Sequence, residues 1–580
     1  IMSDFLHSFG VNKVEKLKRT KYMFPIRNTC DQAQGVLVPL AWHLVTPSEL
    51  WSCRAQSFNR LLLTLAKPVY GDIYFSYTAH FVPLRILFKD YEKMFGDGSP
   101  QEWVNWTEYI IPTVTFDYQN ASRGTQSAGT GYDAVMKTSS NGTSVNSSGH
   151  IISKPGNLAN YCWLPPTRTA SGVSTASKEI NPAPLLAYLR IWSDFYRDEN
   201  WQEEDPDLAK YKAFNSGTYG ARTNLRFSVH YANRFHDYYS SLLPDTQKGP
   251  DVLAFSHLVT LNDLYTLEME GQSSASPIKF GNTSGSIITG AQKLGLDAGL
   301  LTALGDSSSW SSGTKIGSTN LGVEISTDAL RSAFALKRAR ERNARTGSRF
   351  TEAMLSVFEA HLPQAVAQKA EYLGGNSFRL NITSVPSTTY QHAGDLGAFS
   401  ATKDDSEVFR KTFNEPGILM IVGTYRIKHR YAQGIPLAFM KTRRYHSYDP
   451  AFAHISEQPH YAWELAPIND DGVDVIIGFN EPWVEDLKPV DHVCGLMGDV
   501  YGTAWNTYKQ WTFVDEFDVG DGVSPANWLP EWGDEVSKRC TDYNSSYPTW
   551  VFGTDFQADC SVVSPRPLYS IPGYIDHTIA

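Results

Sequence analysis

Four side chains whose types suit hydrolytic chemistry lie close together in the chain: His230, His236, Asp237 and Ser240. Serine, histidine and aspartate are the residue types of a nucleophile, its general base and the group that orients that base. Those roles depend on positions in space, and aromatic-rich turns are more often packing anchors than catalytic sites. We therefore expect no catalytic residue here, and we predict that His236 and Asp237 form structural hydrogen bonds.

Two acidic clusters carry the oxygen ligands that a divalent cation prefers. One lies in VDEFDVGDG and the other in NDDGVDV, and neither follows the EF-hand spacing. Their carboxylates are Asp515, Glu516, Asp518, Asp521, Asp470, Asp471 and Asp474. We interpret both clusters as acidic surface turns, and metal binding stays an open question.

Motifs for other chemistry are absent from the sequence. Neither G-x-x-x-x-G-K-[ST] nor G-x-G-x-x-G occurs, and G-x-S-x-G and H-E-x-x-H are missing too. The six cysteines are far apart and include no C-x-x-C pair, which argues against a zinc module and a dense disulfide framework. No cofactor is predicted, and this lack of motifs favours structural assembly over an enzyme.

The composition limits the classes of partner. The net charge of −10 argues against a protein whose whole surface binds nucleic acid, although local basic patches stay possible. Charged residues make up only 19% of the chain, which leaves room for large subunit interfaces. No apolar run reaches the roughly 18 residues of a membrane span, and no signal peptide is recognisable. We expect synthesis in a reducing cytoplasm, without export by that route.

The elements that must position these side chains are mainly strands. Apolar and polar residues alternate between Gly35 and Leu84, and again from Gly417 to Gln433, as expected for antiparallel strands. Residues 182–201 carry an apolar stripe at helical spacing. The aromatic stretch Tyr231 to Pro250 predicts a packed corner whose first half fits one or two helical turns.

A second predicted helix, residues 326–349, is the most basic stretch of the chain. A solvated or salt-bridged helix face is one interpretation, and contact with a phosphate backbone is the other. Its cations are Arg331, Lys337, Arg338, Arg340, Arg342, Arg345 and Arg349.

Several separated motifs, in order along the chain, resemble the major capsid proteins of gokushovirus-type microviruses (Microviridae). They include FVPLRILFKDYEKMFG, the W-x-x-x-F/Y-R-D-x-N pattern, RFHDYYSSLLPDTQKG, the segment ending in EYLGG, AFAHISEQ and PGYIDH. The positions that carry the family motifs are Trp192, Arg197, Asp198, Arg234, His236, Asp237, Tyr238, Pro244, Gln247, Lys248, Gly249, Tyr372, Gly374 and His454.

The resemblance implies an all-β fold, an eight-stranded antiparallel jelly roll with long inserted loops and a few helices. It also implies a T=1 icosahedral shell of about sixty copies around a circular single-stranded DNA genome. The implied partners are further copies of the chain, the genome on the inner face, a small basic DNA-packaging protein and a host cell-surface receptor. The protein would be part of the virion, assembled in the cytoplasm of a host bacterium.

On this basis the chain divides into five predicted parts. They are an N-terminal arm (1–34), the first part of the jelly roll (35–251), an exposed insertion forming a threefold protrusion (252–325), the remainder of the jelly roll (326–561) and an extended tail (562–580). Two alternatives remain at this point: an aromatic-rich carbohydrate-active enzyme and a host-surface binding module.

Overall fold

The computed structural model describes most of the chain outside its long Gly/Ser-rich stretches. The described residues are 19–89, 91–95, 110–119, 150–168, 175–212, 225–249, 327–346, 349–363, 367–386, 396–452, 456–466, 475–503, 508–517, 525–531, 534–541 and 551–566. The chain forms two compact units, one of residues 247–342 and one of the remaining residues on either side.

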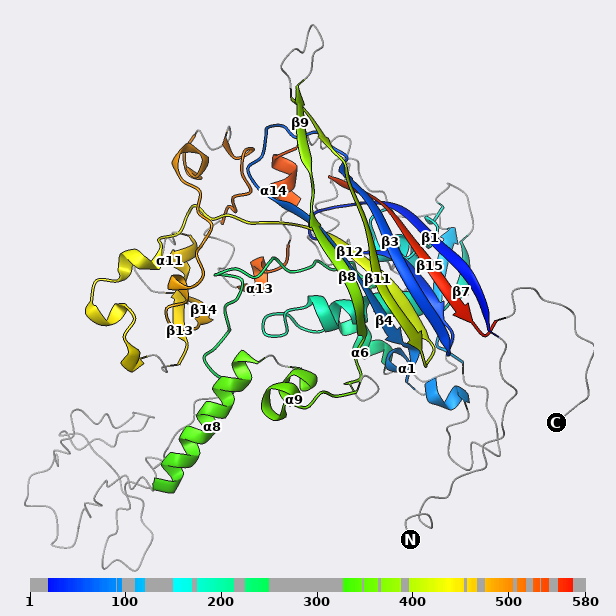
Figure 1. Cartoon of the computed structure of the whole chain (residues 1–580), viewed down its shortest axis with the longest axis horizontal. Coiled ribbons are helices and arrows are strands. Elements are labelled where there is room, and N and C mark those ends of the chain that lie inside the picture. Colours follow the sequence, from blue (N-terminus) through cyan, green and yellow to red (C-terminus); the bar gives the residue numbers. More distant parts are fainter. Residues whose placement is uncertain are drawn as a thin grey trace, which may run out of the picture. The chain divides into compact units, whose positions relative to one another are not determined.

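A four-stranded antiparallel sheet joins segments from both ends of the larger unit (Figure 1). In spatial order its strands are β1 (Thr20–Gln32), β15 (Phe552–Ser564), β3 (Glu49–Leu61) and β11 (Thr402–Phe413). In β3 every second side chain from Glu49 to Asn59 is buried, while those between them are half-buried or exposed. This period of two gives the sheet one core face and one outer face.

A second four-stranded antiparallel sheet packs against the core face of the first. Its order is β2 (Val38–Val45), β12 (Gly417–Ile427), β4 (Ile73–Pro83) and β8 (Glu371–Arg379). Every residue of β12 except Arg426 is buried. Alternate side chains enter two different hydrophobic cores, with Leu419 and Ile421 between the sheets and Met420 and Val422 on the far face. A strand that is covered on both faces has a nearly continuous run of apolar residues in its sequence, and β12 has such a run.

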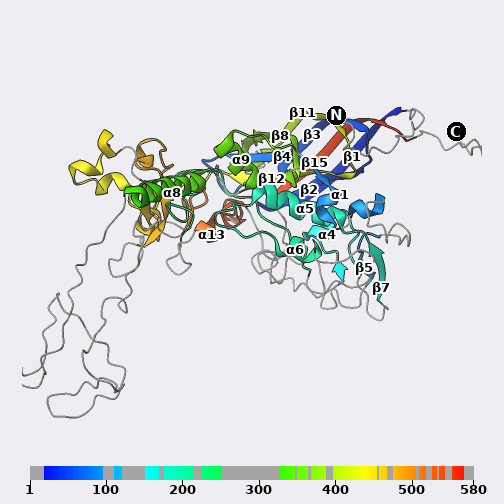
Figure 2. The same cartoon turned by 90° about the horizontal axis from the view of Figure 1, so that it is seen from below.

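Helices cover the far face of the second sheet, where Figure 2 shows α5 beside the strands. Helix α5 spans Ala183–Ile191 and continues as a single π-helical turn, η2 (Trp192–Tyr196). The predicted helix over 182–201 therefore ends five residues too late. Arg197 is extended, and the Asp198 carboxylate accepts the backbone N–H of Asn200 at 2.8 Å, which replaces helical hydrogen bonds by a turn.

The remaining elements are short, apart from α8 and α9. The smaller sheets consist of β5 (Val114–Gln119), β6 (Ile151–Ile152) and β7 (Ala176–Ile180), of β9 (Ile382–Pro386) and β10 (Leu396–Ser400), and of β13 (Gln458–Tyr461) and β14 (Ile476–Asn480). The other α-helices are α1 (Leu84–Leu87), α4 (Leu158–Tyr161), α6 (Pro206–Lys212), α8 (Thr327–Arg345), α9 (Phe350–Phe358), α11 (Ala462–Leu465), α13 (Pro525–Trp528) and α14 (Asp534–Arg539).

The predicted class, mostly antiparallel β structure with a few helices, is confirmed by these sheets. One strand was not anticipated: β1 falls inside the stretch predicted as an N-terminal arm. Its signal was the alternation of Tyr22, Phe24 and Ile26 with polar or exposed neighbours. No helix among the described residues is long and apolar enough to cross a membrane.

Candidate functional site

The aromatic corner is extended at its start, so the predicted helical turns are wrong there. The Ala232 N–H donates to the Gly35 carbonyl at 2.8 Å, and the Arg234 N–H donates to the Leu529 carbonyl at 3.0 Å. These partners lie far away in the chain, and spacing within the corner could not reveal them. The corner thus acts as a junction between three remote segments.

A buried ionic network fastens this junction. Arg234 donates to Asp515 at 2.5 Å, and the His429 ring bridges Asp515 and Glu531, with 2.9 Å on each side. The Gln34 amide donates to Glu531 at 2.8 Å. All these residues are buried. Charges so deeply buried are tolerated only when they are paired and hydrogen-bonded.

The network shifts the pKa values of its ionisable side chains. Burial and the Arg234 charge oppose protonation of His429, but Asp515 and Glu531 outweigh them and raise its pKa to about 9. Burial favours the neutral form of Asp515, yet Arg234 and His429 hold its pKa below the usual range. At neutral pH the network therefore holds two cations and two anions.

The candidate hydrolytic residues do not assemble. His230 pairs with Asp205 at 2.7 Å. His236 is exposed, whereas Asp237 accepts the Tyr431 hydroxyl at 2.6 Å and the Ser240 N–H at 2.7 Å. The Ser240 hydroxyl donates to the Phe235 carbonyl at 3.0 Å, and no histidine of the described residues is hydrogen-bonded to it.

The acidic clusters have different outcomes. Asp515 is 4% exposed, so the surface-turn interpretation is wrong for this residue. Asp518, Asp521 and the carboxylates of 470–474 lie outside the described residues. Within the described part of the chain no group of three potential ligands is arranged to hold a metal ion.

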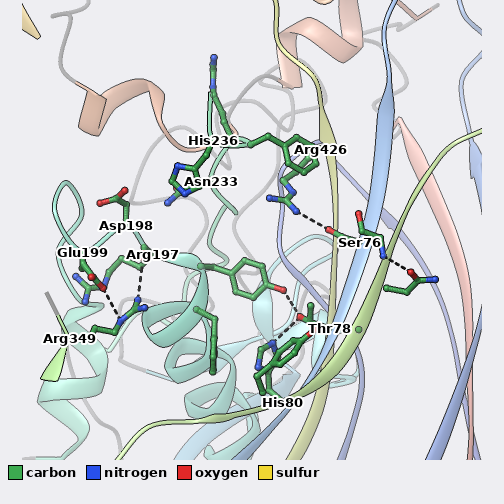
Figure 3. A pocket seen from close by; sticks show the side chains of 18 of the residues that line it. Ser76, Thr78, His80, Arg197, Asp198, Glu199, Asn233, His236, Arg349 and Arg426 are labelled. Carbon is green, nitrogen blue, oxygen red and sulfur yellow. Dashed lines mark hydrogen bonds and ion pairs between the residues drawn. The ribbon is translucent and has the colours of Figure 1, made fainter. Parts of the chain in front are cut away.

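A cavity of about 720 Å³ lies beside the corner, on the far face of the second sheet (Figure 3). Strands β4, β8 and β12 form one wall, and the residues after η2 form the opposite one. Its lining includes Arg197, Asp198, Glu199, Asn233, Arg234, Phe235, His236, Arg349, Tyr372, Asn376 and Arg426. The sequence did not point to this cavity, because its lining comes from six separate stretches.

The predicted basic helix is α8, with Arg349 lying beyond its end. Arg331, Lys337, Arg338, Arg342 and Arg345 are exposed, and Arg340 is half-buried. Arg345 pairs with the buried Glu457, and Arg349 pairs with Glu199 at 3.0 Å. The charge of these last two cations is therefore compensated by carboxylates.

Most family-motif positions are packing or turn residues. The Trp192 indole donates to the Tyr231 carbonyl at 2.9 Å, and the Tyr238 hydroxyl donates to Glu464 at 3.0 Å. Tyr372 is 53% exposed. In the smaller unit Gln247 is buried, Lys248 is half-buried and Gly249 has a φ of +95°, whereas Pro244, in the larger unit, is exposed; His454 lies outside the described residues.

Gly374 marks a close approach between the two large sheets. Its φ is +156°, and a Cβ atom there would lie 2.2 Å from the Val408 carbonyl oxygen of β11. The register shifts where β4 pairs with β8, between Ala79 and His80, and where β11 pairs with β3, between Glu407 and Phe409. Only glycine fits such an approach of two backbones.

The described residues form a two-sheet β fold with a structural corner, and the candidate hydrolytic residues among them do not assemble into a site. The chain belongs to the phage capsid protein family described as "Capsid protein (F protein)", whose model matches residues 13–141 and 169–574. The predicted resemblance to microvirus capsid proteins is thereby confirmed, and the chain is not an enzyme, so the carbohydrate-active alternative is wrong.

Three relatives are similar over nearly their whole length. "Capsid protein VP1" of Spiroplasma virus 4 is 27% identical, covering 98% of this chain and 97% of the relative. "Capsid protein VP1" of Chlamydia phage 1 is 26% identical, with 94% and 95% covered. "Capsid protein VP1" of Bdellovibrio phage phiMH2K is 23% identical, with 92% of each chain covered.

Proposed function

We propose that this capsid protein is an eight-stranded jelly roll that assembles into a T=1 shell of about sixty copies around a circular single-stranded DNA genome. The main observation that supports the jelly roll is the order of the strands in the two large sheets. The two large sheets contain eight strands, which can be numbered one to eight along the chain. In the first sheet the neighbouring strands are then the first, eighth, third and sixth, and in the second sheet they are the second, seventh, fourth and fifth. Such interleaving fits the two Greek keys of a jelly roll.

The surface supports burial against further copies. Large apolar side chains that are exposed in the single chain suit interfaces, where apolar and aromatic residues are enriched. The most exposed are Met23, Phe95, Phe334, Phe350, Phe358, Phe439, Tyr501 and Leu487. Heterologous contacts between such surfaces must close into rings to give a finite shell.

The mass of the purified particle tests the shell. We expect closed particles of about sixty subunits by mass photometry and electron microscopy. A stable monomer would contradict the proposal. Trimers without a closed shell would favour the host-surface binding module instead.

For genome contact we propose α8, whose cations contribute charge without reading sequence. Replacing Arg338, Arg340 and Arg342 by glutamine is expected to lower packaged DNA at unchanged particle yield. It should also reduce the slope of log affinity for single-stranded DNA against log salt by about 2. The matched control replaces the same three residues by lysine, which keeps the charge and should package normally. Equal DNA content in both variants would reject this role.

The remaining parts of the proposal concern the virion exterior and its helpers. The insertion at 252–325, which lies outside the described residues, would form a threefold protrusion that binds a host receptor. Deleting residues 260–315 should leave shells intact and lower attachment to host cells; loss of assembly would make the insertion structural instead. Because the chain carries a net charge of −10, a small basic protein would assist packaging in the host cytoplasm. Its absence from purified DNA-filled particles would refute that part.

A further inference from the structure

The cavity beside the corner has an unbalanced set of charges. Of its four arginines, Arg234 and Arg349 pair with the carboxylates of Asp515 and Glu199. Arg197 donates to the backbone carbonyls of Ser193 and Gln202, and no ion pair to it is found among the described residues. Arg426 likewise has no carboxylate within ion-pair distance in the described part of the chain.

Arg426 is the most unusual of these cations. It is the single residue of β12 that is not fully buried, and burial still lowers its pKa despite Glu531 and Tyr196. One terminal nitrogen makes a long bond of 3.4 Å to the Ser76 hydroxyl, and its Nε has no hydrogen-bond partner among the residues that the structure describes. A guanidinium in such surroundings gains most from an anion that accepts two of its N–H groups.

The acidic residues of the lining are already engaged. The Asp198 carboxylate accepts the backbone N–H groups of Asn200 and Trp201, at 2.8 and 3.2 Å. Glu199 is held by Arg349. The two uncompensated cations therefore face a cavity whose own carboxylates are committed elsewhere, and the cavity selects for an anionic ligand.

Aromatic rings and cavity size narrow the ligand further. The guanidinium of Arg426 lies 4.1 Å from the centre of the Phe235 ring, and the half-exposed ring of Tyr372 lies in the same lining. A volume of about 720 Å³ far exceeds that of an inorganic ion and suits an organic ligand. A cation next to exposed aromatic rings is the combination that binds a phosphate together with a stacked base. An acidic side chain would engage the cations and leave the ring unused.

We propose that this cavity binds a nucleoside phosphate, with Arg426 and Arg197 at the phosphate and the Tyr372 ring against the base. The ligand is either one unit of single-stranded DNA or a free nucleotide. Its assignment to the genome rests on the proposed function, whereas binding itself does not.

The test titrates thymidine 5′-monophosphate into DNA-free, full-length protein and follows binding by calorimetry. We expect binding at least about tenfold tighter than that of inorganic phosphate, because the base adds stacking. Arg426→Gln should weaken binding by about tenfold or more. Tyr372→Ala should weaken nucleotide binding by about tenfold and leave phosphate binding unchanged. Arg410→Gln, an exposed change of the same charge on the other large sheet, should have no effect.

Three results would overturn the proposal. They are equal affinities for phosphate and nucleotide, tighter binding of a hexaglutamate peptide, and unchanged affinity in both cavity variants. If Arg426→Gln fails to fold, Tyr372→Ala still decides the matter, since that side chain is 53% exposed and its loss is tolerated.

The source of the nucleotide is found by ultraviolet cross-linking of DNA-filled particles. A cross-link between the genome and the peptide containing Tyr372 identifies the genome, whereas nucleotide binding without a cross-link identifies the free nucleotide. Particle mass is recorded in parallel. Closed shells that do not bind nucleotide would refute the nucleotide site but not the proposed shell. Protein that binds nucleotide but never forms closed shells would refute the proposed shell but not the nucleotide site.

Discussion

Replacing Asp515 by asparagine is expected to lower the free energy of unfolding of the subunit by about 3–5 kcal/mol, the usual consequence of breaking a buried ion pair. Two cations, Arg234 and His429, would lose their shared carboxylate in a site that is almost closed to water. The loss also loosens the junction between the corner and the segment that follows β12. Urea unfolding of dissociated subunits, followed by tryptophan fluorescence, measures the change.

The matched control is Asp405→Asn on the outer face of the first sheet. Asp405 accepts two hydrogen bonds from Arg54, at 2.6 and 2.7 Å, but the Arg54 side chain is 61% exposed. Water and salt replace such a pair at little cost, so no measurable change is expected. If the two variants unfold alike, burial does not give the Asp515 network its strength.

The stability of the subunit is expected to be greatest near pH 6.5, because two buried histidines are shifted in opposite directions. The folded pKa of His429 is about 9, so its contribution is complete below the unfolded value of 6.5 and is lost as the pH rises through 9. Burial lowers the pKa of His80 to about 3, so its contribution is present above 6.5 and is lost as the pH falls towards 3. The alkaline loss amounts to roughly 3 kcal/mol.

Urea unfolding between about pH 4 and about pH 10 tests this dependence, because that range covers most of the interval between the folded pKa values of His80 and His429, about 3 and about 9. His429→Gln should flatten the alkaline side of the profile and leave the acid side unchanged. His80→Gln should flatten the acid side of the profile and leave the alkaline side unchanged. This holds down to the pH range where carboxylates begin to protonate. An alkaline slope that persists in His429→Gln would show that another group titrates there.

Local patterns predicted the parts of the fold that depend on local physics. The apolar run beginning at Gly417 became β12, and the basic stretch became α8, which ends at Arg345 instead of 349. The corner was recognised as a packed element, but its helical turns were not found. Its hydrogen-bond partners, Gly35 and Leu529, lie about 200 and 300 residues away, and no spacing rule reports contacts over such separations.

The ionic network and the cavity were outside the reach of the sequence for the same reason. Asp515 looked like one of several carboxylates in a polar turn, and only the fold places it against Arg234 and His429. Arg426 lies in a stretch of alternating apolar and polar residues, and nothing in the sequence distinguished it from its neighbours. It became distinctive only because η2 and the corner lie over that face of the sheet and enclose its guanidinium.

Because β15 lies between β1 and β3, the first sheet of a subunit can be completed only after the end of the chain has been synthesised. β15 is the last strand of its sheet to leave the ribosome, yet it pairs with a neighbour on each side along nearly its whole length. Until residues 552–564 emerge, β1 and β3 have no partner between them and their edges stay open, as in other folds dominated by distant pairings. A chain broken off early therefore lacks the middle of a sheet rather than its margin. A copy that ends before residue 552 would therefore expose two unpaired strand edges, one on β1 and one on β3.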